Sequence, residues 1–317
     1  MSQIYDYTIL GAGAVGSVFG GLLTQAGFRV QLVNRSAETG KAIAENGLRL
    51  DLSKGDVVCH PDAVQPQDAA PARFVMAFTK THQTEAALLS IRDAMRPGTV
   101  FVTLQNGLGN AELVAQVTGS AQVLHGVTML PATLLAPGHV RSHGSSQTWI
   151  GPVRIQDLPL AQTVHDDLRR AGFDMVLADD PAGRIWQKAC FNVALNGVCA
   201  LAMGSPGLIQ ATDGLQDQAH ALADEAIAVA VAEGAVVDSS AVHKLIDFAC
   251  AEHTYHKPSM LQDIEAGRLT EVDTLNGHVV ARAAVHRLDV PLNKLILTLI
   301  KARQDAPVFW QGAPTSH

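Results

Sequence analysis

A glycine-rich loop near the start of the chain restricts its possible folds more than any other sequence feature. The loop fits the pattern GxGxxG with Gly11, Ala12, Gly13, Ala14, Val15 and Gly16. It follows an apolar run of strand type, Tyr7–Leu10, and opens a segment of helical length, Ala14–Ala26. In this setting the first glycine permits a tight turn, the second lets the backbone approach a pyrophosphate, and the third allows close helix–strand packing. We therefore predict that residues 1–35 form a dinucleotide-binding βαβ unit rather than a glycine-rich turn without a ligand.

The residues after the second predicted strand indicate which dinucleotide this unit would bind. The strand Phe28–Val33 is followed by Asn34 and Arg35, with no acidic residue at its end. An NAD site usually places Asp or Glu there for the ribose 2′-hydroxyl, whereas a guanidinium can pair with a 2′-phosphate. Lys80 follows another strand-like run, Phe74–Phe78, at the strand end where ligands gather in parallel sheets. Arg35 and Lys80 therefore predict NADP(H) as the cofactor, and the alternative is two solvated surface charges.

Strand-like and helix-like segments alternate through the first half of the chain. Residues 74–78 and Thr99–Leu104 indicate buried strands, and the segment Gln83–Met95 between them has helical character. Such alternation is typical of a parallel sheet covered by helices on both faces. Residues 123–155 are β-like pieces interrupted by Pro and Gly. We predict an α/β domain over residues 1–182 that ends in a hinge-like stretch, Leu177–Gly183.

The second half of the chain has a different pattern. Ala-rich segments of helical length follow one another: Arg184–Met203, Gly214–Glu233, Ser240–His253, Ser259–Gly267, Val272–His286 and Leu292–Gln304. We predict a helical domain over residues 183–317, in which residues 312–317 form a frayed tail.

The composition fits two globular domains and argues against several classes of protein. The 317 residues are 47% hydrophobic and 17% charged, which favours packed cores over disorder. A net charge of −7 gives no reason to expect nucleic acid as a partner. The four cysteines have neither disulfide-framework nor metal-ligand spacing, so we expect no metal site and a reducing, cytoplasmic location. No secretory signal or membrane-spanning run stands out.

A polar stripe marks the segment Trp186–Asn196. Lys188, Asn192 and Asn196 lie four residues apart, so on a helix they share one face. The rest of the segment is mostly apolar, and polar groups within such a surface need partners or face a cleft. The stripe predicts a lysine directed at a substrate oxygen with amides that orient it. The alternative is a solvated stripe on a surface helix.

Three further polar residues are candidates whose spacing leaves two interpretations open. Asn106 follows a predicted strand and could present its amide to a cofactor or substrate, although Asn-Gly is equally a turn signal. Ser259 pairs at helical spacing with Asp263, or caps a helix after Pro258. Glu271 lies where a helix begins, so it is either a site residue or a first-turn carboxylate that the helix dipole favours.

The sequence resembles the ketopantoate reductases (2-dehydropantoate 2-reductases) along nearly its whole length. The resemblance is strongest in ILGAGAVGS, LQNGLG, WQKACFNVALN and PSMLQDIEAGRLTEVDTLNG, and the last of these is long and specific. It implies a Rossmann-type N-terminal domain, an all-helical C-terminal domain and a cleft between them. The implied reaction is NADPH-dependent reduction of 2-dehydropantoate to (R)-pantoate, on the route to pantothenate and coenzyme A.

The resemblance also implies roles for single residues on the substrate side. Lys188 matches the family's general acid, and Glu271 matches a carboxylate at the junction of cofactor and substrate. Asn106 matches an asparagine near both. The substrate-binding positions are matched by Asn192, Asn196 and Ser259.

On the cofactor side, Arg35 and Lys80 match the residues that hold the 2′-phosphate. Gln83 keeps the family's spacing after Lys80, and Ala132 aligns with a backbone contact to the cofactor. A small-molecule 2-keto acid is therefore the expected partner, with no nucleic acid and no membrane. The C-terminal helices could also pair in a homodimer.

Two departures from the family pattern affect the substrate side. Well-studied members have Asn-Pro where this chain has Asn196-Gly197, and a substrate-contacting asparagine is replaced near Pro206. The alternatives are therefore a reductase of another branched 2-keto acid, an opine- or hydroxyacid-type dehydrogenase of the same build, or a non-catalytic protein that senses NADPH.

Overall fold

The computed structural model describes residues 4–144 and 147–310, and the chain divides into two compact units, residues 1–181 and residues 182–317. The tail predicted over residues 312–317 lies outside the described residues.

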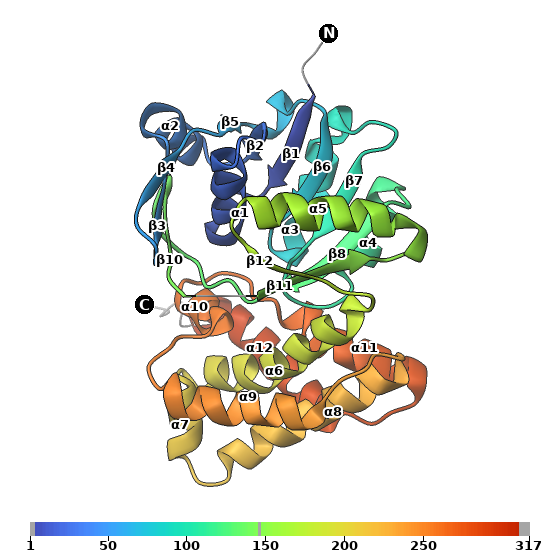
Figure 1. Ribbon diagram of the computed structural model, residues 1–317. Coiled ribbons are helices and arrows are strands. Elements are labelled where there is room, and N and C mark those ends of the chain that lie inside the picture. Colours follow the sequence, from blue (N-terminus) through green and yellow to red (C-terminus); the bar gives the residue numbers. More distant parts are fainter. Residues whose placement is uncertain (1–3, 145–146, 311–317) are drawn as a thin grey trace, which may run out of the picture. The chain divides into compact units, whose positions relative to one another are not determined.

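A mostly parallel sheet forms the framework of unit 1 (Figure 1). Its described strands follow the spatial order β12-β11-β8-β7-β6-β1-β2-β5. Their bounds are β1 (Tyr5–Leu10), β2 (Val30–Val33), β5 (Asp62–Val64), β6 (Ala72–Ala77), β7 (Val100–Thr103), β8 (Val123–Thr128), β11 (Gln147–Pro152) and β12 (Asp174–Leu177). The neighbouring strands β8, β7, β6, β1, β2 and β5 are all parallel, which confirms the predicted α/β class. Strand β11, on the other side of β8, is antiparallel to it. The reversal occurs because the chain between β8 and β11 contains strands and no crossover helix.

Helices cover both faces of this sheet. Strand β1 contributes to a separate apolar core on each face, because successive side chains of a strand point to opposite sides. Tyr7 and Ile9 pack with Phe19 of α1 (Ala14–Gln25), and α5 (Leu158–Arg170) joins the same core. Leu10 packs in the other core with Leu88 of α3 (Thr81–Ser90), beside α4 (Asn110–Thr118). Both faces of the sheet are therefore buried, as the sequence predicts.

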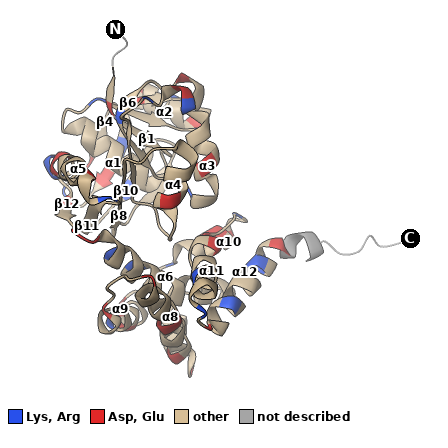
Figure 2. Ribbon diagram, turned by 90° about the vertical axis from the view of Figure 1, so that its right-hand side faces the viewer, with Lys and Arg blue, Asp and Glu red and all other residues tan. Residues whose placement is uncertain are grey.

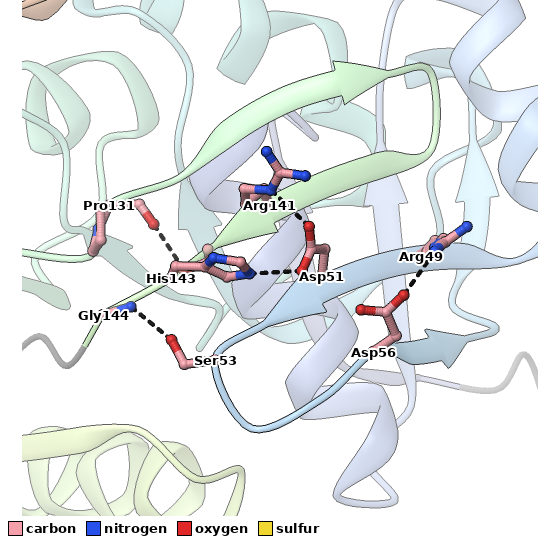
Figure 3. Close-up of polar contacts among 9 residues, drawn as sticks. Arg49, Asp51, Ser53, Asp56, Pro131, Arg141, His143 and Gly144 are labelled. Carbon is pink, nitrogen blue, oxygen red and sulfur yellow. Dashed lines mark hydrogen bonds and ion pairs between the residues drawn. The ribbon is translucent and has the colours of Figure 1, made fainter. Parts of the chain in front are cut away.

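A second, four-stranded sheet among the described residues was not predicted. It has the order β4-β3-β10-β9, with β3 (Leu48–Leu52), β4 (Val57–Cys59), β9 (Thr133–Ala136) and β10 (His139–Ser142). At one end Asp51 accepts hydrogen bonds from Arg141 Nε and His143 Nε2, both at 2.6 Å (Figure 3). These two hydrogen bonds hold the pKa of the Asp51 carboxyl below its usual value. They join two stretches of chain that lie far apart in sequence.

Unit 2 is helical in its described part, as predicted. Its helices are α6 (Pro181–Ala202, which begins at the last residue of unit 1), α7 (Pro206–Ala211), α8 (Leu215–Ala232), α9 (Ser239–Glu252), α10 (Ser259–Glu265), α11 (Asn276–His286) and α12 (Pro291–Trp310). The hinge expected over Leu177–Gly183 is shorter, since α6 already begins at Pro181, a residue favoured at the first helical position. The helix expected over Val272–His286 is divided: a 3₁₀ turn, Val272–Thr274, precedes α11, and Leu275 between them is not helical. Acidic and basic residues are interspersed over the ribbon of each unit (Figure 2).

The glycine loop gives a stability prediction for unit 1. A β-carbon at Gly16 would lie 2.3 Å from the Gly11 carbonyl oxygen, so Gly16→Ala forces the helix away from the strand. We expect a loss of about 1–3 kcal/mol in the free energy of unfolding, the usual range for overpacking, measured by urea denaturation. Gly13→Ala is the control, because no described atom lies within 4 Å of its added β-carbon. Equal losses in the two variants would contradict this account of the loop.

Candidate active site

The predicted cofactor residues lie at one edge of the large sheet. Strands β8, β7, β6, β1 and β2 are neighbours and parallel, so their carboxyl ends meet there. The residues that follow these ends are Ala132 after β8, Asn106 after β7, Lys80 and Gln83 after β6, Gly11–Gly16 after β1, and Arg35 after β2. This edge is where open α/β sheets bind their ligands.

The geometry of the glycine loop fits a bound pyrophosphate. Gly11 has φ of +99°, a conformation that side-chain-bearing residues rarely adopt. Gly13 is the N-terminal cap of α1, makes no side-chain capping bond and leaves the space beside its backbone open. An anion can therefore come close to the first-turn N–H groups of α1, where the helix dipole also favours negative charge. The residues present fit a dinucleotide.

Arg35 lies in the exposed turn between β2 and helix α2 (Ala37–Asn46). The turn is ordered by its neighbours: Asn34 Oδ1 accepts from the Ser36 N–H at 3.0 Å, and Ser36 Oγ accepts from the Thr39 N–H at 3.2 Å. The nearest following acidic residue, Glu38, is already inside α2. The edge of the sheet thus presents a guanidinium where an NAD site usually has a carboxylate.

Lys80 and Asn106 occupy the loops after two adjacent strands. Lys80 is the N-terminal cap residue of α3 and is half-buried, and its carbonyl oxygen accepts from the Gln83 N–H at 2.8 Å. Asn106 is also half-buried, and its carbonyl oxygen accepts from Asn110 Nδ2 at 3.0 Å. Ala132 packs against the first core of unit 1. The polar residues that hold these loops were not predicted, although Gln105 lies directly beside Asn106 in the sequence.

In unit 2 the polar stripe lies on α6, a helix whose second half is buried. Lys188 and Asn192 are half-buried and Asn196 is buried, and their spacing places them on one face. Val193 and Ala194, between the two asparagines, belong to the buried residues of the unit. A stripe in this position differs from the solvated surface stripe that was the alternative.

Glu271 is the charged neighbour of Lys188. It is buried, with 7% of its surface exposed, and its carbonyl oxygen accepts from the Thr274 and Leu275 N–H groups at 3.1 Å. Burial lowers the pKa of the Lys188 ammonium group to about 8, against the opposing attraction of the Glu271 carboxylate. A lysine with a pKa near neutrality can donate and recover a proton under ordinary conditions.

Ser259 is the first residue of α10, and Pro258 occupies the capping position. The alternative of Ser259 as a helix cap is therefore wrong. Asp263, one turn further on, is buried and accepts from Arg268 Nε at 3.0 Å.

The two departures from the family pattern have local explanations in unit 2. A β-carbon at Gly197 would lie 2.4 Å from Ile296 Cγ2 of α12, so the isoleucine occupies the space that a larger residue at 197 would need. Pro206 begins α7 with Ser205 as the capping residue, which suits the fixed φ of proline.

Over residues 4–144 and 147–310, no group of three or more His, Cys, Asp or Glu side chains is arranged to hold a metal ion. None of the helices in the described part of the chain is both long and apolar enough to cross a bilayer.

Two family models match the chain. Residues 7–154 match ketopantoate reductase PanE/ApbA, and residues 180–304 match the ketopantoate reductase PanE/ApbA C terminal. Together they cover most of both units.

Individual relatives are similar over nearly their whole length. The 2-dehydropantoate 2-reductase of Pyrococcus horikoshii is 32% identical over 93% of this chain and 96% of its own. That of Archaeoglobus fulgidus is 33% identical over 94% of this chain and 98% of its own.

Solved structures are similar in fold over the same extent. A complex of D-mandelate dehydrogenase with NADH and anilino(oxo)acetate has a TM-score of 0.89 and 27% identity, over 95% of this chain and 99% of its own. A PanE/ApbA family ketopantoate reductase from Ralstonia eutropha JMP134 has a TM-score of 0.87 and 28% identity, also over 95% and 99%.

The influence of Glu271 on Lys188 can be measured directly. We expect Lys188 to titrate with a pKa of about 8, and with a lower pKa in Glu271→Gln, because the neutral amide no longer attracts the ammonium group. Carbon-13 NMR of lysine-labelled protein follows this titration, and Lys188→Arg assigns the signal. Glu265→Gln is the control, since Glu265 pairs with Lys257 at 2.7 Å. A Lys188 pKa that stays near 10.5 in every variant would show that the site does not act on it.

Proposed function

The chain belongs to the ketopantoate reductase family, and on that premise we propose that it reduces 2-dehydropantoate to (R)-pantoate with NADPH, in the biosynthesis of pantothenate and coenzyme A. The observation that supports this most is the pair of Lys188 and Glu271, in which loss of solvation lowers the pKa of the lysine to about 8. Together with a dinucleotide-binding edge, such a lysine provides what reduction of a keto group needs: a cofactor site and a proton donor.

The proposed mechanism divides the work between the two units. When bound to unit 1, NADPH supplies the hydride that goes to the keto carbon. Lys188 stabilises the negative charge that develops on the keto oxygen and donates the proton that completes the hydroxyl group. The resulting neutral amine recovers its proton from water, and the pKa of about 8 makes both steps accessible near neutrality.

The remaining site residues hold the substrate and set the state of the lysine. We assign the amides of Asn192 and Asn196, one turn apart on α6, and the Ser259 hydroxyl to the substrate's carboxylate and distal hydroxyl. Asn106 is assigned to orientation of the carbonyl group. Glu271 favours the charged form of Lys188 and is assigned as an acceptor for the substrate hydroxyl.

The cofactor side favours NADPH over NADH. Arg35 and Lys80 follow β2 and β6, which both flank β1, and both side chains can pair with a 2′-phosphate. Gln83 in the first turn of α3 and the backbone of Ala132 are assigned to the same cofactor. NAD(P)(H) binding as such is supported by the NADH complex of the D-mandelate dehydrogenase to which this chain is similar.

Simpler features support the proposals of a cytoplasmic location and a homodimer. All four cysteines are buried free thiols, which suits a reducing cytoplasm. Leu295 and Leu299 are exposed one turn apart on α12, so one of the C-terminal helices offers apolar surface for pairing. We propose a homodimer on this ground, and a monomeric mass by light scattering would exclude it.

A second candidate is reduction of another 2-keto acid. It is favoured by the similarity to D-mandelate dehydrogenase and by Gly197, which departs from the family on the substrate side. A protein that only senses NADPH is a third possibility, and it would leave the lowered pKa of Lys188 without a purpose.

NADPH oxidation with a panel of 2-keto acids tests the function. We expect 2-dehydropantoate to give the highest kcat/KM, and kcat/KM to fall as the pH rises above about 8, where Lys188 loses its proton.

Lys188→Ala should lower kcat by about a hundredfold or more, the range for a general acid. A higher kcat/KM for another keto acid would establish the second candidate, and cofactor binding without oxidation would establish the third. Near-normal turnover of Lys188→Ala with the same pH profile would remove the lysine from the mechanism.

Arg35→Ala tests the cofactor preference. We expect the Kd for NADPH to rise by roughly tenfold or more, since a charge-assisted pair is lost, while the Kd for NADH scarcely changes. Fluorescence titration of both nucleotides measures this, with Arg29→Ala as the control at the opposite end of β2. If both cofactors weakened equally in Arg35→Ala, the guanidinium would have no specific role at the 2′-phosphate.

A further inference from the structure

The loops that contain Lys80 and Asn106 are joined by buried polar side chains that the proposed mechanism does not use. Both loops follow neighbouring parallel strands, β6 and β7. Each has only a few residues between its strand and the next helix. Two side-chain bridges link them, one on each side of Lys80 in the sequence.

Gln105 forms the first bridge. Its Nε2 donates to the Thr79 carbonyl oxygen at 2.5 Å and to Thr84 Oγ1 at 2.8 Å. Its Oε1 accepts from Thr103 Oγ1 at 3.0 Å, which fixes the orientation of the amide. Gln105 and Thr84 are buried, at 8% and 0% exposed, so loss of these hydrogen bonds would leave polar atoms without solvent to replace them. Gln105, which precedes Asn106, is thus hydrogen-bonded to Thr79, which precedes Lys80.

Thr81 and Asn110 form the second bridge. Thr81 Oγ1 donates to Asn110 Oδ1 at 2.9 Å, and Asn110 Nδ2 donates to the carbonyl oxygens of Asn106 and Gly107 at 3.0 and 3.2 Å. Both side chains are buried. Lys80 therefore lies between two residues that are each tied to the loop of Asn106.

The glycine loop rests against the same point. A β-carbon at Gly11 would lie 2.8 Å from the Thr79 nitrogen and 2.9 Å from its Cγ2. The Phe78 N–H also donates to the Leu10 carbonyl oxygen at 2.9 Å. Thr79 is thus fixed by the loop after β1 on one side and by Gln105 on the other.

We propose that Gln105 is a positioning residue that places the Lys80 loop and the Asn106 loop together, so that selection of the 2′-phosphate and orientation of the substrate carbonyl are set by one buried amide. This inference rests on the proposed function, because it takes the assigned roles of Lys80 and Asn106 as given. Lys80 would contact only the 2′-phosphate, so displacement of its loop should weaken NADPH more than NADH.

The chain offers a matched control for the test. Gln31 of β2 is fully buried, and its Nε2 likewise donates to a threonine hydroxyl and a backbone carbonyl, those of Thr8 and Ala70, both at 2.6 Å. Ala70 precedes β6, so this glutamine serves the opposite edge of the sheet. Gln31→Met and Gln105→Met remove the same chemical groups at the two edges.

The experiment is a fluorescence titration of the full chain with NADPH and with NADH, alongside thermal unfolding. For Gln105→Met we expect the Kd for NADPH to rise about tenfold and that for NADH less than about threefold, and a tenfold change equals about one buried hydrogen bond in free energy. Gln31→Met should lower Tm but leave both Kd values within about twofold. Thr84→Val removes one partner of Gln105, together with the bonds of Thr84 Oγ1 to Thr79 Oγ1 and to the Lys80 carbonyl oxygen. It should give a rise of the same kind, which keeps the test open if Gln105→Met does not fold.

The outcomes separate this inference from the proposed function, because the titration needs no keto acid. If the unmodified chain prefers NADPH and Gln105→Met and Thr84→Val keep that preference, Gln105 has no positioning role. Equal losses for both nucleotides in Gln105→Met and Gln31→Met would show a purely structural effect and overturn it too. If the unmodified chain binds NADH as tightly as NADPH, the cofactor proposal fails and this inference fails with it.

Discussion

The close approach of backbone to backbone at the glycine loop is the contact on which the nucleotide edge of unit 1 depends. Gly16 lets α1 lie against the carbonyl of Gly11, and Gly11 in turn lies against Thr79 of the next loop. No side chain could be added at either place without moving a helix or a strand. Phe19 of α1 packs in the core that also contains Tyr7 and Ile9. The same contact at the glycine loop therefore also sets the position of this helix on its face of the sheet.

In unit 2 the comparable constraint is electrostatic. The charged form of a lysine among apolar residues loses solvation free energy, and at Lys188 this loss lowers the pKa of the ammonium group. Glu271 partly restores the charged form from a neighbouring segment. The site therefore needs both the apolar surface of α6 and one carboxylate from outside that helix. Removal of the apolar surface would raise the pKa of Lys188, and removal of the carboxylate would lower it.

Features that depend on neighbouring residues can be predicted from the sequence. Strand, turn and helix around Gly11 follow one another directly along the chain. The spacing of Lys188, Asn192 and Asn196 places them on one face as soon as the segment is known to be a helix. The small sheet is different, because β3 pairs with β10, as Leu50 does with Val140, across most of the domain. Nothing in either short segment identifies its partner. The bond from Gln105 to Thr79 was missed for the same reason, although each residue lies beside a predicted one.

The contact between Gly197 and Ile296 has a consequence for how the substrate side of this chain can change with time. Position 197 of α6 and position 296 of α12 share one small volume, which the isoleucine fills. A larger residue at 197 is admissible only after 296 has become smaller, and a smaller residue at 296 leaves a void until 197 grows. We therefore expect the two positions to vary as a pair among close relatives.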